Sequence, residues 1–383
     1  MKLLSLTEDY PPDIGGGATY AYEVSKRLKK NYGVDVSILT KENVLNDKNA
    51  NFLKIKSGNY KGTGGMIGFN RAKLIYEMIQ KTKRLQNNFD LINIYTGMVT
   101  MTTLWILKKL KQLKKPVVMS YINSNTGYWQ DIYPFPMSNI YNIVEKELLV
   151  GVKYDKYVVL DLGVGANKLL IEGGVPKDKI VMHYQGVDCN LFKPAKKKKN
   201  EIPVIGFIGR SDPFKGIDLF ISSIKILSKH TKNFKLLLRV DDNFKEKLDS
   251  VSKMLGIQKN ISYVKPLPYN SLPTEFYNKC DLLVSLDIRA FENPEILLLT
   301  PCEAMACGTL VVSSSKPRKE WGKKTWITLE KSDPELLAKI YIDVLENPEK
   351  YKNITLDARK IAEKYFDWNK VTELYYKTFK SII

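Results

Sequence analysis

The feature that most constrains this chain is an alternation of short apolar segments with longer amphipathic ones, which occurs twice along the sequence. The first half opens with an apolar run at 2–7, helical spacing at 19–30 and a β-branched run at 34–40. Short buried strands separated by helices predict a parallel sheet covered on both faces. We therefore expect an α/β fold, and the same alternation continues through 91–95, 102–113, 116–121, 157–160 and 180–183.

The alternation stops at Phe192 to Ala195 and starts afresh after the four lysines at 196–199. A solvated charge run between two similar patterns predicts a linker. The second series of segments lies at 204–208, 217–229, 234–239, 244–255, 261–264, 282–286, 302–307 and 310–313, and the tail at 354–366 and 368–379 has helical spacing. We predict two Rossmann-like doubly wound domains, at 1–194 and 202–365, a Lys-rich linker at 195–201 and a C-terminal helix at 366–383.

The net charge of +19 raises the question of a nucleic-acid partner. Residues 1–194 carry a net charge of +10 and residues 195–383 carry +9, so neither half holds the excess. A nucleic-acid module would concentrate its charge, and no recognised binding motif is present. We therefore expect no nucleic-acid partner.

Few residues are available for metal or histidine chemistry. The chain has two histidines, His183 and His230, and four cysteines without a C-x-x-C pair. This scarcity excludes most zinc chemistry, and the cysteine pattern favours a reducing, intracellular compartment. No apolar run approaches the length that spans a bilayer, and the apolar start ends at Glu8, too early for a signal peptide.

The first candidate site is the glycine run Gly15, Gly16 and Gly17, between the first predicted strand and the first predicted helix. Glycines let the backbone approach a ligand closely, and a helix N-terminus attracts anions. The run lacks the spacing of a dinucleotide fingerprint, so a flexible strand-to-helix turn is the alternative interpretation.

The equivalent loop of the second half contains Gly209, Arg210, Lys215 and Gly216. The arginine fork and the lysine charge suit phosphate oxygens, and the glycines allow the turn to close around them. Two cations at a strand end could also be surface charge, but the flanking glycines favour an anion site.

Two glutamates, Glu295 and Glu303, enclose the apolar residues Ile296, Leu297 and Leu298, and the second precedes a run of small residues. A glutamate at a helix start can simply cap the helix. The functional alternative is that each carboxylate accepts hydrogen bonds from sugar hydroxyls.

Together these motifs resemble the retaining GT-B glycosyltransferases related to glycogen synthase and bacterial mannosyltransferases, that is, glycosyltransferase family 4 or glycosyl transferases group 1. The matching residues follow the family's order over nearly the whole chain. They are Pro11-Pro12 with Gly15 to Gly17, Gly186-Val187-Asp188 with Phe192 and Pro194, Gly209-Arg210 with Lys215-Gly216, the E-x7-E pair Glu295 and Glu303, the run from Glu303 to Gly308, and Phe366-Asp367-Trp368.

The resemblance implies transfer of a hexose from a UDP- or GDP-linked donor to a glycan or lipid-linked acceptor, with retention at the anomeric carbon, in cell-surface glycan or glycolipid synthesis. Arg210 and Lys215 would hold the diphosphate, Glu303 the ribose and Glu295 the donor sugar. The N-terminal domain would bind the acceptor and the C-terminal domain the nucleotide sugar. Gly15 to Gly17 would approach the donor phosphates or the acceptor across a central cleft, and the C-terminal helix would cross back to the N-terminal domain. No cofactor and no metal would be required.

The chain departs from the family pattern at three places. It has Ile296, Leu297 and Leu298 where the family usually has Gly-Phe-Gly against the donor, Ile122 where a histidine is common, and 240–243 in place of a glycine-rich turn. The expected donor-binding set is Gly15, Gly16, Gly17, Gly209, Arg210, Lys215, Glu295, Ile296, Leu297, Leu298 and Glu303. The alternative function is a weak or inactive GT-B-like protein that binds a nucleotide or glycan.

The segment 104–115 mixes apolar residues in helical spacing with five lysines. Such a basic amphipathic helix can lie on an anionic membrane. The alternative is a helix packed on the sheet with its lysines in water. We expect a cytoplasmic protein that this segment could hold at the inner face of the cell membrane.

Overall fold

The structure is a computed structural model that describes residues 1–11, 16–41, 48, 50–55, 69–122, 134–163, 165–195, 200–209, 211–265, 267–322 and 325–383. It divides into two compact units. Unit 1 comprises Met1–Asp161, Gly165–Tyr184 and Trp368–Ile383, and unit 2 comprises Leu162–Val164 and Gln185–Asp367. The predicted linker 195–201 falls within the span of unit 2, and its residues 196–199 lie outside the described residues.

Unit 1 contains a seven-stranded parallel sheet of order β3-β2-β1-β4-β5-β6-β7. Its strands are buried almost throughout, which explains their continuous apolar character. The half-buried β3 is an edge strand that the sequence analysis missed. The bounds are β1 (Lys2–Leu6), β2 (Asp35–Lys41), β3 (Asn51–Ile55), β4 (Leu91–Tyr95), β5 (Val117–Tyr121), β6 (Lys156–Leu160) and β7 (Ile180–His183).

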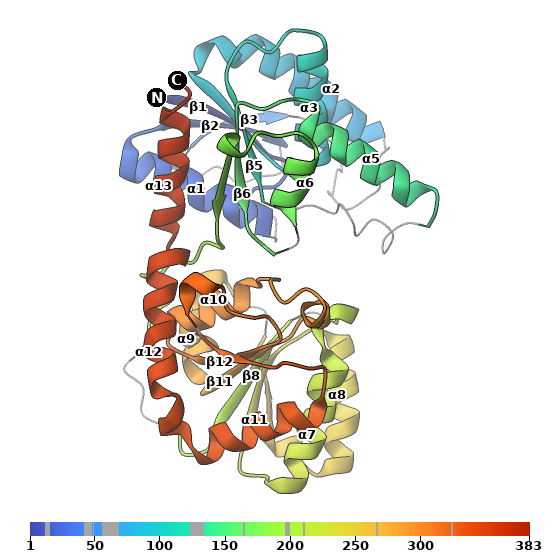
Figure 1. The fold of residues 1–383 in the computed structure, drawn as a ribbon, viewed down its shortest axis with the longest axis vertical. Coiled ribbons are helices and arrows are strands. Elements are labelled where there is room, and N and C mark those ends of the chain that lie inside the picture. Colours follow the sequence, from blue (N-terminus) through green and yellow to red (C-terminus); the bar gives the residue numbers. More distant parts are fainter. Residues whose placement is uncertain are drawn as a thin grey trace. The chain divides into compact units, whose positions relative to one another are not determined.

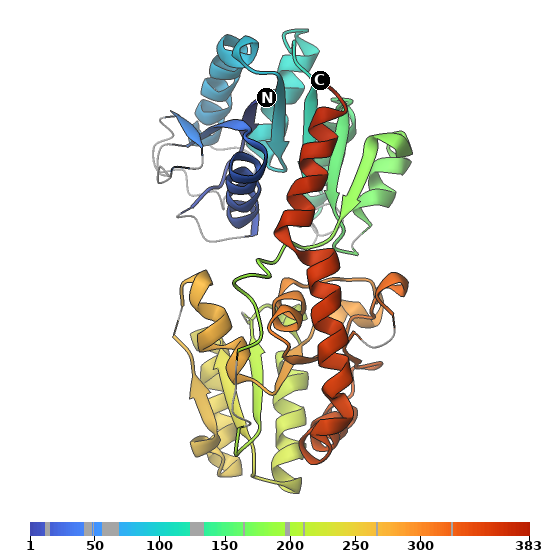
Figure 2. The same ribbon diagram turned by 90° about the vertical axis from the view of Figure 1, so that its left-hand side faces the viewer.

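Helices cover both faces of this sheet (Figures 1 and 2). One face packs against α2 (Phe69–Leu85), α3 (Met98–Lys109), α5 (Met137–Val150) and α6 (Ala166–Glu172), which share one apolar core with it. The other carries α1 (Gly16–Tyr32) and α13 (Trp368–Lys380), which contact each other. The described C-terminal helix therefore completes the fold of unit 1.

The contact between α1 and α13 is built on aromatic rings around a buried histidine. The Tyr20 ring meets the Trp368 ring edge-on at 4.7 Å between centroids. His183 Nδ1 donates to the carbonyl of Tyr184 at 2.8 Å, and its Nε2 accepts from the Tyr20 hydroxyl at 3.1 Å. Burial lowers the pKa of His183 to about 4, so the ring is neutral at physiological pH and has a structural role here.

Helix α3 does not have the bounds that the sequence pattern predicted. It spans Met98–Lys109, four residues before the expected 102–113, and the backbone after it turns at Lys111, whose φ is 55°. Leu104 is fully buried in the core that α3 shares with the sheet, and Leu107 is fully buried as well. Segment 104–115 therefore begins as a helix packed inward, which was the alternative to a helix on a membrane, and Lys108 and Lys109 remain exposed.

Unit 2 contains a six-stranded parallel sheet of order β10-β9-β8-β11-β12-β13. The order reverses between β8 and β11, and in doubly wound folds ligands bind at the carboxyl ends of the strands at this point. The bounds are β8 (Val204–Ile208), β9 (Lys235–Arg239), β10 (Ile261–Tyr263), β11 (Leu282–Ser285), β12 (Leu310–Ser313) and β13 (Ile327–Thr328).

The helices of unit 2 also form two layers. One face of the sheet shares an apolar core with α7 (Ile217–His230), α8 (Asp242–Leu255) and α11 (Pro334–Glu346). Against β11 and β12 packs α10 (Leu299–Ala306), which in turn contacts α12 (Lys352–Ile361), and the short α9 (Leu272–Glu275) lies in the loop before β11. The predicted helix 354–366 ends at Ile361 and continues as a wider π turn over Ala362–Phe366.

Candidate functional site in unit 2

The glycine run of unit 1 lies at the start of α1, after the carboxyl end of β1. Gly16 and Gly17 open the helix, whereas Gly15 lies outside the described residues. Among the described residues, a Cβ built on Gly17 would come within 4 Å of Ile122 Cδ1 alone, at 3.8 Å, which is an ordinary contact. These neighbours do not require a glycine at 17, and a glycine there permits a ligand to approach the backbone closely.

In unit 2 the cationic loop follows β8 at the reversal of strand order. Gly209 leads out of the strand, Arg210 lies outside the described residues, and Lys215 ends a short 3₁₀ turn. Gly216 then adopts φ 66°, and a Cβ there would approach Leu286 Cβ to 2.9 Å. Because only glycine fits this conformation and this space, the turn that carries Lys215 has one permitted shape.

A second arginine, which the sequence analysis missed, lies beside Lys215. Arg289 follows β11 and binds Asp287 with two hydrogen bonds, Nε to Oδ1 at 2.9 Å and Nη2 to Oδ2 at 2.6 Å. Its guanidinium lies 4.0 Å from the centroid of the Phe214 ring, and Lys215 Nζ lies 5.5 Å from the same centroid. The contact of Arg289 with Phe214 thus joins the loop after β11 to the loop after β8, with Lys215 near the same ring.

Glu303 is buried in α10 with 3% of its surface exposed. The Tyr277 hydroxyl donates to its Oε2 at 2.5 Å, and Tyr269 provides a second side-chain hydrogen bond. Burial raises the pKa of Glu303 to about 7, against the opposing effects of both tyrosines and of Arg239. The carboxyl group can therefore change charge near neutral pH, and it faces three polar groups that sequence spacing did not connect with it.

Arg239 is the last residue of β9 and also belongs to this region. Its charge acts on Glu303, and within the described residues its Nε has no hydrogen-bond partner although that atom is buried. The backbone N–H of Gly209 donates to the Arg239 carbonyl at 3.1 Å, which ties it to the cationic loop. A buried guanidinium N–H without a partner in the described residues, at the carboxyl end of a strand, is suited to an anionic or carbonyl-bearing ligand.

Glu295 differs from Glu303 in its exposure. Its side chain is 71% exposed and forms an ion pair with Arg318 at 3.1 Å, whereas the Arg318 side chain is only 10% exposed. Ile296 and Leu297 are both buried, and Leu298 directly precedes α10. The three residues that replace the family's Gly-Phe-Gly thus lead into the helix of Glu303, with two apolar side chains packed inward.

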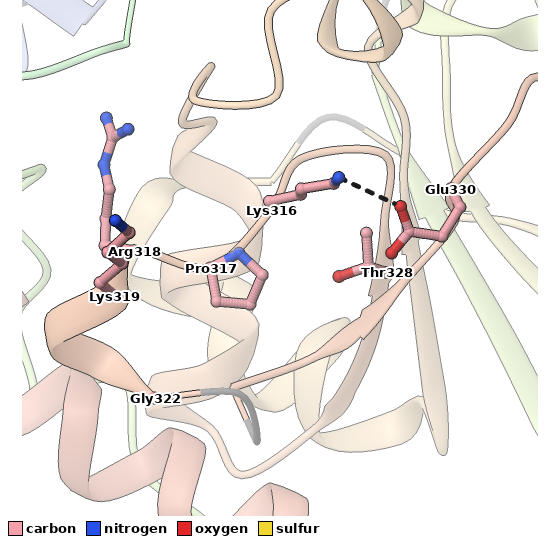
Figure 3. A pocket seen from close by; sticks show the side chains of 7 residues that line it. All are labelled: Lys316, Pro317, Arg318, Lys319, Gly322, Thr328 and Glu330. Carbon is pink, nitrogen blue, oxygen red and sulfur yellow. Dashed lines mark ion pairs between the residues drawn. The ribbon is translucent and has the colours of Figure 1, made fainter.

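Arg318 also borders a hollow of about 500 Å³ at the carboxyl ends of β12 and β13 (Figure 3). In Figure 3 the Lys316 side chain spans the hollow toward Glu330, with which it forms an ion pair at 3.3 Å, and Arg318 points away from Glu330. The Lys316 N–H donates to the Pro294 carbonyl at 2.8 Å, so this basic turn is fastened to the segment of Glu295. The hollow is lined by Lys316, Pro317, Arg318, Lys319, Gly322, Thr328 and Glu330.

The described residues offer neither a metal cluster nor a membrane-spanning helix. Among the described residues, no three His, Cys, Asp or Glu side chains gather as metal ligands. No helix in these ranges is long and apolar enough to cross a bilayer. His230, on the last turn of α7, is half-exposed and pairs with Glu346 at 3.1 Å, while His183 lies in unit 1. Neither histidine lies among the residues of the candidate site.

Comparison with known proteins identifies this architecture. Residues 190–361, which include both glutamates and the cationic loop, match the family described as glycosyl transferases group 1. The chain is 23% identical over 346 residues to a D-inositol 3-phosphate glycosyltransferase of Corynebacterium glutamicum, covering 79% of this chain and 76% of that protein. It is 22% identical to an uncharacterized glycosyltransferase of Methanocaldococcus jannaschii, over 100% of this chain and 99% of that one.

The solved structure of Anabaena HepE in complex with UDP and glucose superimposes with a TM-score of 0.71 at 16% identity, over 100% of both chains. Two parallel doubly wound sheets with this likeness define the GT-B fold. The match of residues 190–361 to glycosyl transferases group 1, together with the relatives named as glycosyltransferases, indicates a transferase. The predicted fold class and enzyme class are thereby confirmed.

Proposed function

We propose that this enzyme moves a hexose from a nucleotide diphosphate sugar to a glycan or lipid-linked acceptor with retention at the anomeric carbon. The observation that carries the proposal is the placement of Lys215, Arg239, Glu303 and Glu295 in one sheet unit: Lys215 follows β8, Arg239 ends β9, and Glu295 and Glu303 lie between β11 and β12, Glu303 within α10. The solved complex of Anabaena HepE with UDP and glucose supports a nucleotide sugar as the donor class.

In the proposed reaction, Arg210 and Lys215 bind the diphosphate and stabilise the charge that develops on it as the bond from anomeric carbon to phosphate oxygen breaks. The acceptor oxygen forms its bond on the same face of the sugar. The acceptor proton passes to the leaving phosphate oxygen, so no side chain is needed as the base. This chemistry agrees with a candidate site that contains neither of the two histidines.

Glu303 would accept hydrogen bonds from the ribose hydroxyls, and Glu295 from hydroxyls of the donor sugar. For Glu303 this requires its carboxylate to exchange the Tyr277 hydroxyl for a ribose hydroxyl or to accept both. Arg318 would orient Glu295 through their ion pair. Arg239 is a further candidate for donation to the nucleotide.

The test uses the purified full chain with UDP-hexoses and GDP-hexoses and with glycan and lipid-linked acceptors. Transfer is followed by nucleotide release and mass spectrometry, and the anomeric configuration of the product by NMR. We expect Lys215→Ala and Glu295→Ala to abolish transfer without loss of folded structure. Lys225→Ala, at an exposed position of α7, is the matched control and should keep full activity.

Full activity in Lys215→Ala or Glu295→Ala would overturn the assignment of these residues, and an inverted product would overturn retention. If the chain binds a nucleotide but neither transfers nor slowly hydrolyses any donor, the alternative function given in the sequence analysis holds. The protein would then be a GT-B-like binder of nucleotide or glycan.

A further inference from the structure

Helix α5 of unit 1 carries apolar side chains on the side that faces away from the core. Phe135, just before the helix, is 80% exposed, and Met137, Ile140 and Ile143 are 41%, 45% and 69% exposed. Residues three apart on a helix lie on one side of it, so the last three form a continuous stripe. We call these four residues the α5 face.

The core of unit 1 does not need this face. The opposite side of α5 buries Tyr141, Leu148 and Leu149, and the last two belong to the core that α5 shares with the sheet. A single exposed apolar residue is ordinary, but a row of four marks an interaction surface.

At the C-terminal end of α5, the α5 face is bordered by charged and aromatic side chains. One turn after Ile143 comes Glu147, which accepts from Trp105 Nε1 of α3 at 3.0 Å and pairs with Lys109 Nζ at 3.4 Å. Lys109 Nζ also lies 5.4 Å from the centroid of the Trp105 ring. The end of α3, with its exposed lysines, therefore adjoins α5 (Figure 1), as the contacts between the two helices require.

In the described part of the chain the charge around the α5 face is net positive, because Glu147 at its border is paired with Lys109 while Lys108 and Lys146 are exposed. Between 134 and 146 the only acid is Glu145, which is buried, whereas Lys146 is exposed beside Ile143. Lys108 and Lys109 add exposed positive charge at the border. An apolar stripe with a tryptophan and lysines at its margin suits the headgroup region of an anionic bilayer, where rings and aliphatic stems enter and ammonium groups meet phosphates.

We propose that the α5 face, bordered by Trp105, Lys108, Lys109 and Lys146, docks unit 1 on an anionic lipid surface. A second copy of the chain fits less well, because pairing of two such faces would bring lysines of like charge together. The proposal deepens the lipid-linked part of the proposed function. It also revises the expectation for segment 104–115: α5 supplies the apolar contact, and the end of α3 supplies its charge.

The experiment is vesicle flotation with the full chain, in the absence of donor and acceptor. One set of vesicles contains phosphatidylcholine alone and the other about one-third phosphatidylglycerol, which reproduces an anionic leaflet. Because a chain of net charge +19 adsorbs to anionic vesicles by charge alone, binding is also measured in about 0.5 M salt, where charges are screened beyond roughly 4 Å.

We expect the wild-type chain to float with anionic vesicles and to keep part of this binding in high salt. In high salt, the partition coefficient of the double variant Ile140→Ser and Ile143→Ser should be at least about tenfold lower than that of the wild type. Each substitution removes a branched apolar side chain that would enter the lipid. Met254→Ser is the matched control, because Met254 on α8 of unit 2 is 74% exposed. It should bind like the wild type.

Equal binding of the double variant and the wild type in high salt would overturn the proposal. So would a wild-type dimer in size-exclusion chromatography that Ile140→Ser dissociates, since the occupant would then be a second copy. Transfer to a soluble acceptor distinguishes the two failures. If the enzyme is active but does not float, only the proposed lipid-binding role of the α5 face is refuted. If the chain floats but does not transfer a sugar, only the proposed function is refuted.

Discussion

Replacement of Glu303 by glutamine should make unit 2 more stable at alkaline pH. Burial raises the pKa of Glu303 from 4.5 to about 7, so the folded state holds a proton that the unfolded state has released. The contribution of the Glu303 carboxyl to the free energy of unfolding is therefore highest below about pH 4.5. It falls as the pH rises to about 7 and stays low above that. The fall amounts to about 3 kcal/mol, whereas glutamine is neutral throughout.

The assay is guanidinium unfolding followed by tryptophan fluorescence at about pH 5 and about pH 8. Trp321 and Trp326 report on unit 2 because both are buried there. The advantage of Glu303→Gln over the wild type should grow by about 3 kcal/mol between the two pH values. Asp218→Asn removes the same charge from a side chain that is 90% exposed, and its difference from the wild type should stay nearly constant.

An advantage of Glu303→Gln that is equal at both pH values would refute the reasoning, since it would mean that the carboxyl is not held in a poorly hydrated site. The same variant separates stability from function. If Glu303 accepts ribose hydroxyls as proposed, the variant gains stability at alkaline pH while its affinity for the nucleoside diphosphate falls.

Three further predictions concern other parts of the chain. Unit 1 should lose about 3 kcal/mol as the pH falls from about 6.5 to about 4, because burial lowers the pKa of His183 to about 4; a flat profile of thermal unfolding over this range would contradict this. Gly216→Ala should cost about 1–2 kcal/mol and raise the donor KM by displacing Lys215, measured by unfolding and steady-state kinetics; a wild-type KM would show that the loop tolerates a Cβ. Arg318→Met should lower kcat at least about tenfold with a smaller change in donor KM, and Arg318→Lys should restore part of it; an unchanged kcat would remove Arg318 from the site.

Much of the architecture could be predicted from local patterns. Buried parallel strands must be apolar on both faces, so β1, β4, β5, β8 and β11 are recognisable from composition alone. Glycine at 216 is likewise required by backbone geometry. The half-buried β3 carries Asn51 and Lys54, and edge strands of this kind lack a continuous apolar signal.

The side-chain partners in the site could not be predicted in the same way. Tyr277 and Glu303 are 26 residues apart, and they meet because Tyr277 lies in the turn that leads into β11 while α10 packs on β11 and β12. Arg318 reaches Glu295 because the turn after β12 is bonded to Pro294. Such contacts depend on the paths of loops, which sequence spacing does not encode.

Helical periodicity also left the surroundings of an apolar face undetermined. The pattern at 104–115 is compatible with a bilayer or with a sheet, and the structure shows Leu104 in the core shared with the sheet and Leu107 fully buried. The exposed row on α5 has ordinary amphipathic spacing, so only knowledge of which side packs inward reveals it.

The assignment of Trp368–Ile383 to unit 1 affects the order in which the chain can fold during synthesis. The ribosome releases unit 2 residues 185–367 before the helix that covers Tyr20 and His183 has emerged. Unit 2 can therefore complete its core while unit 1 still lacks α13. A stall or truncation before residue 368 would leave unit 1, although synthesised first, as the part that exposes an apolar surface to chaperones and proteases.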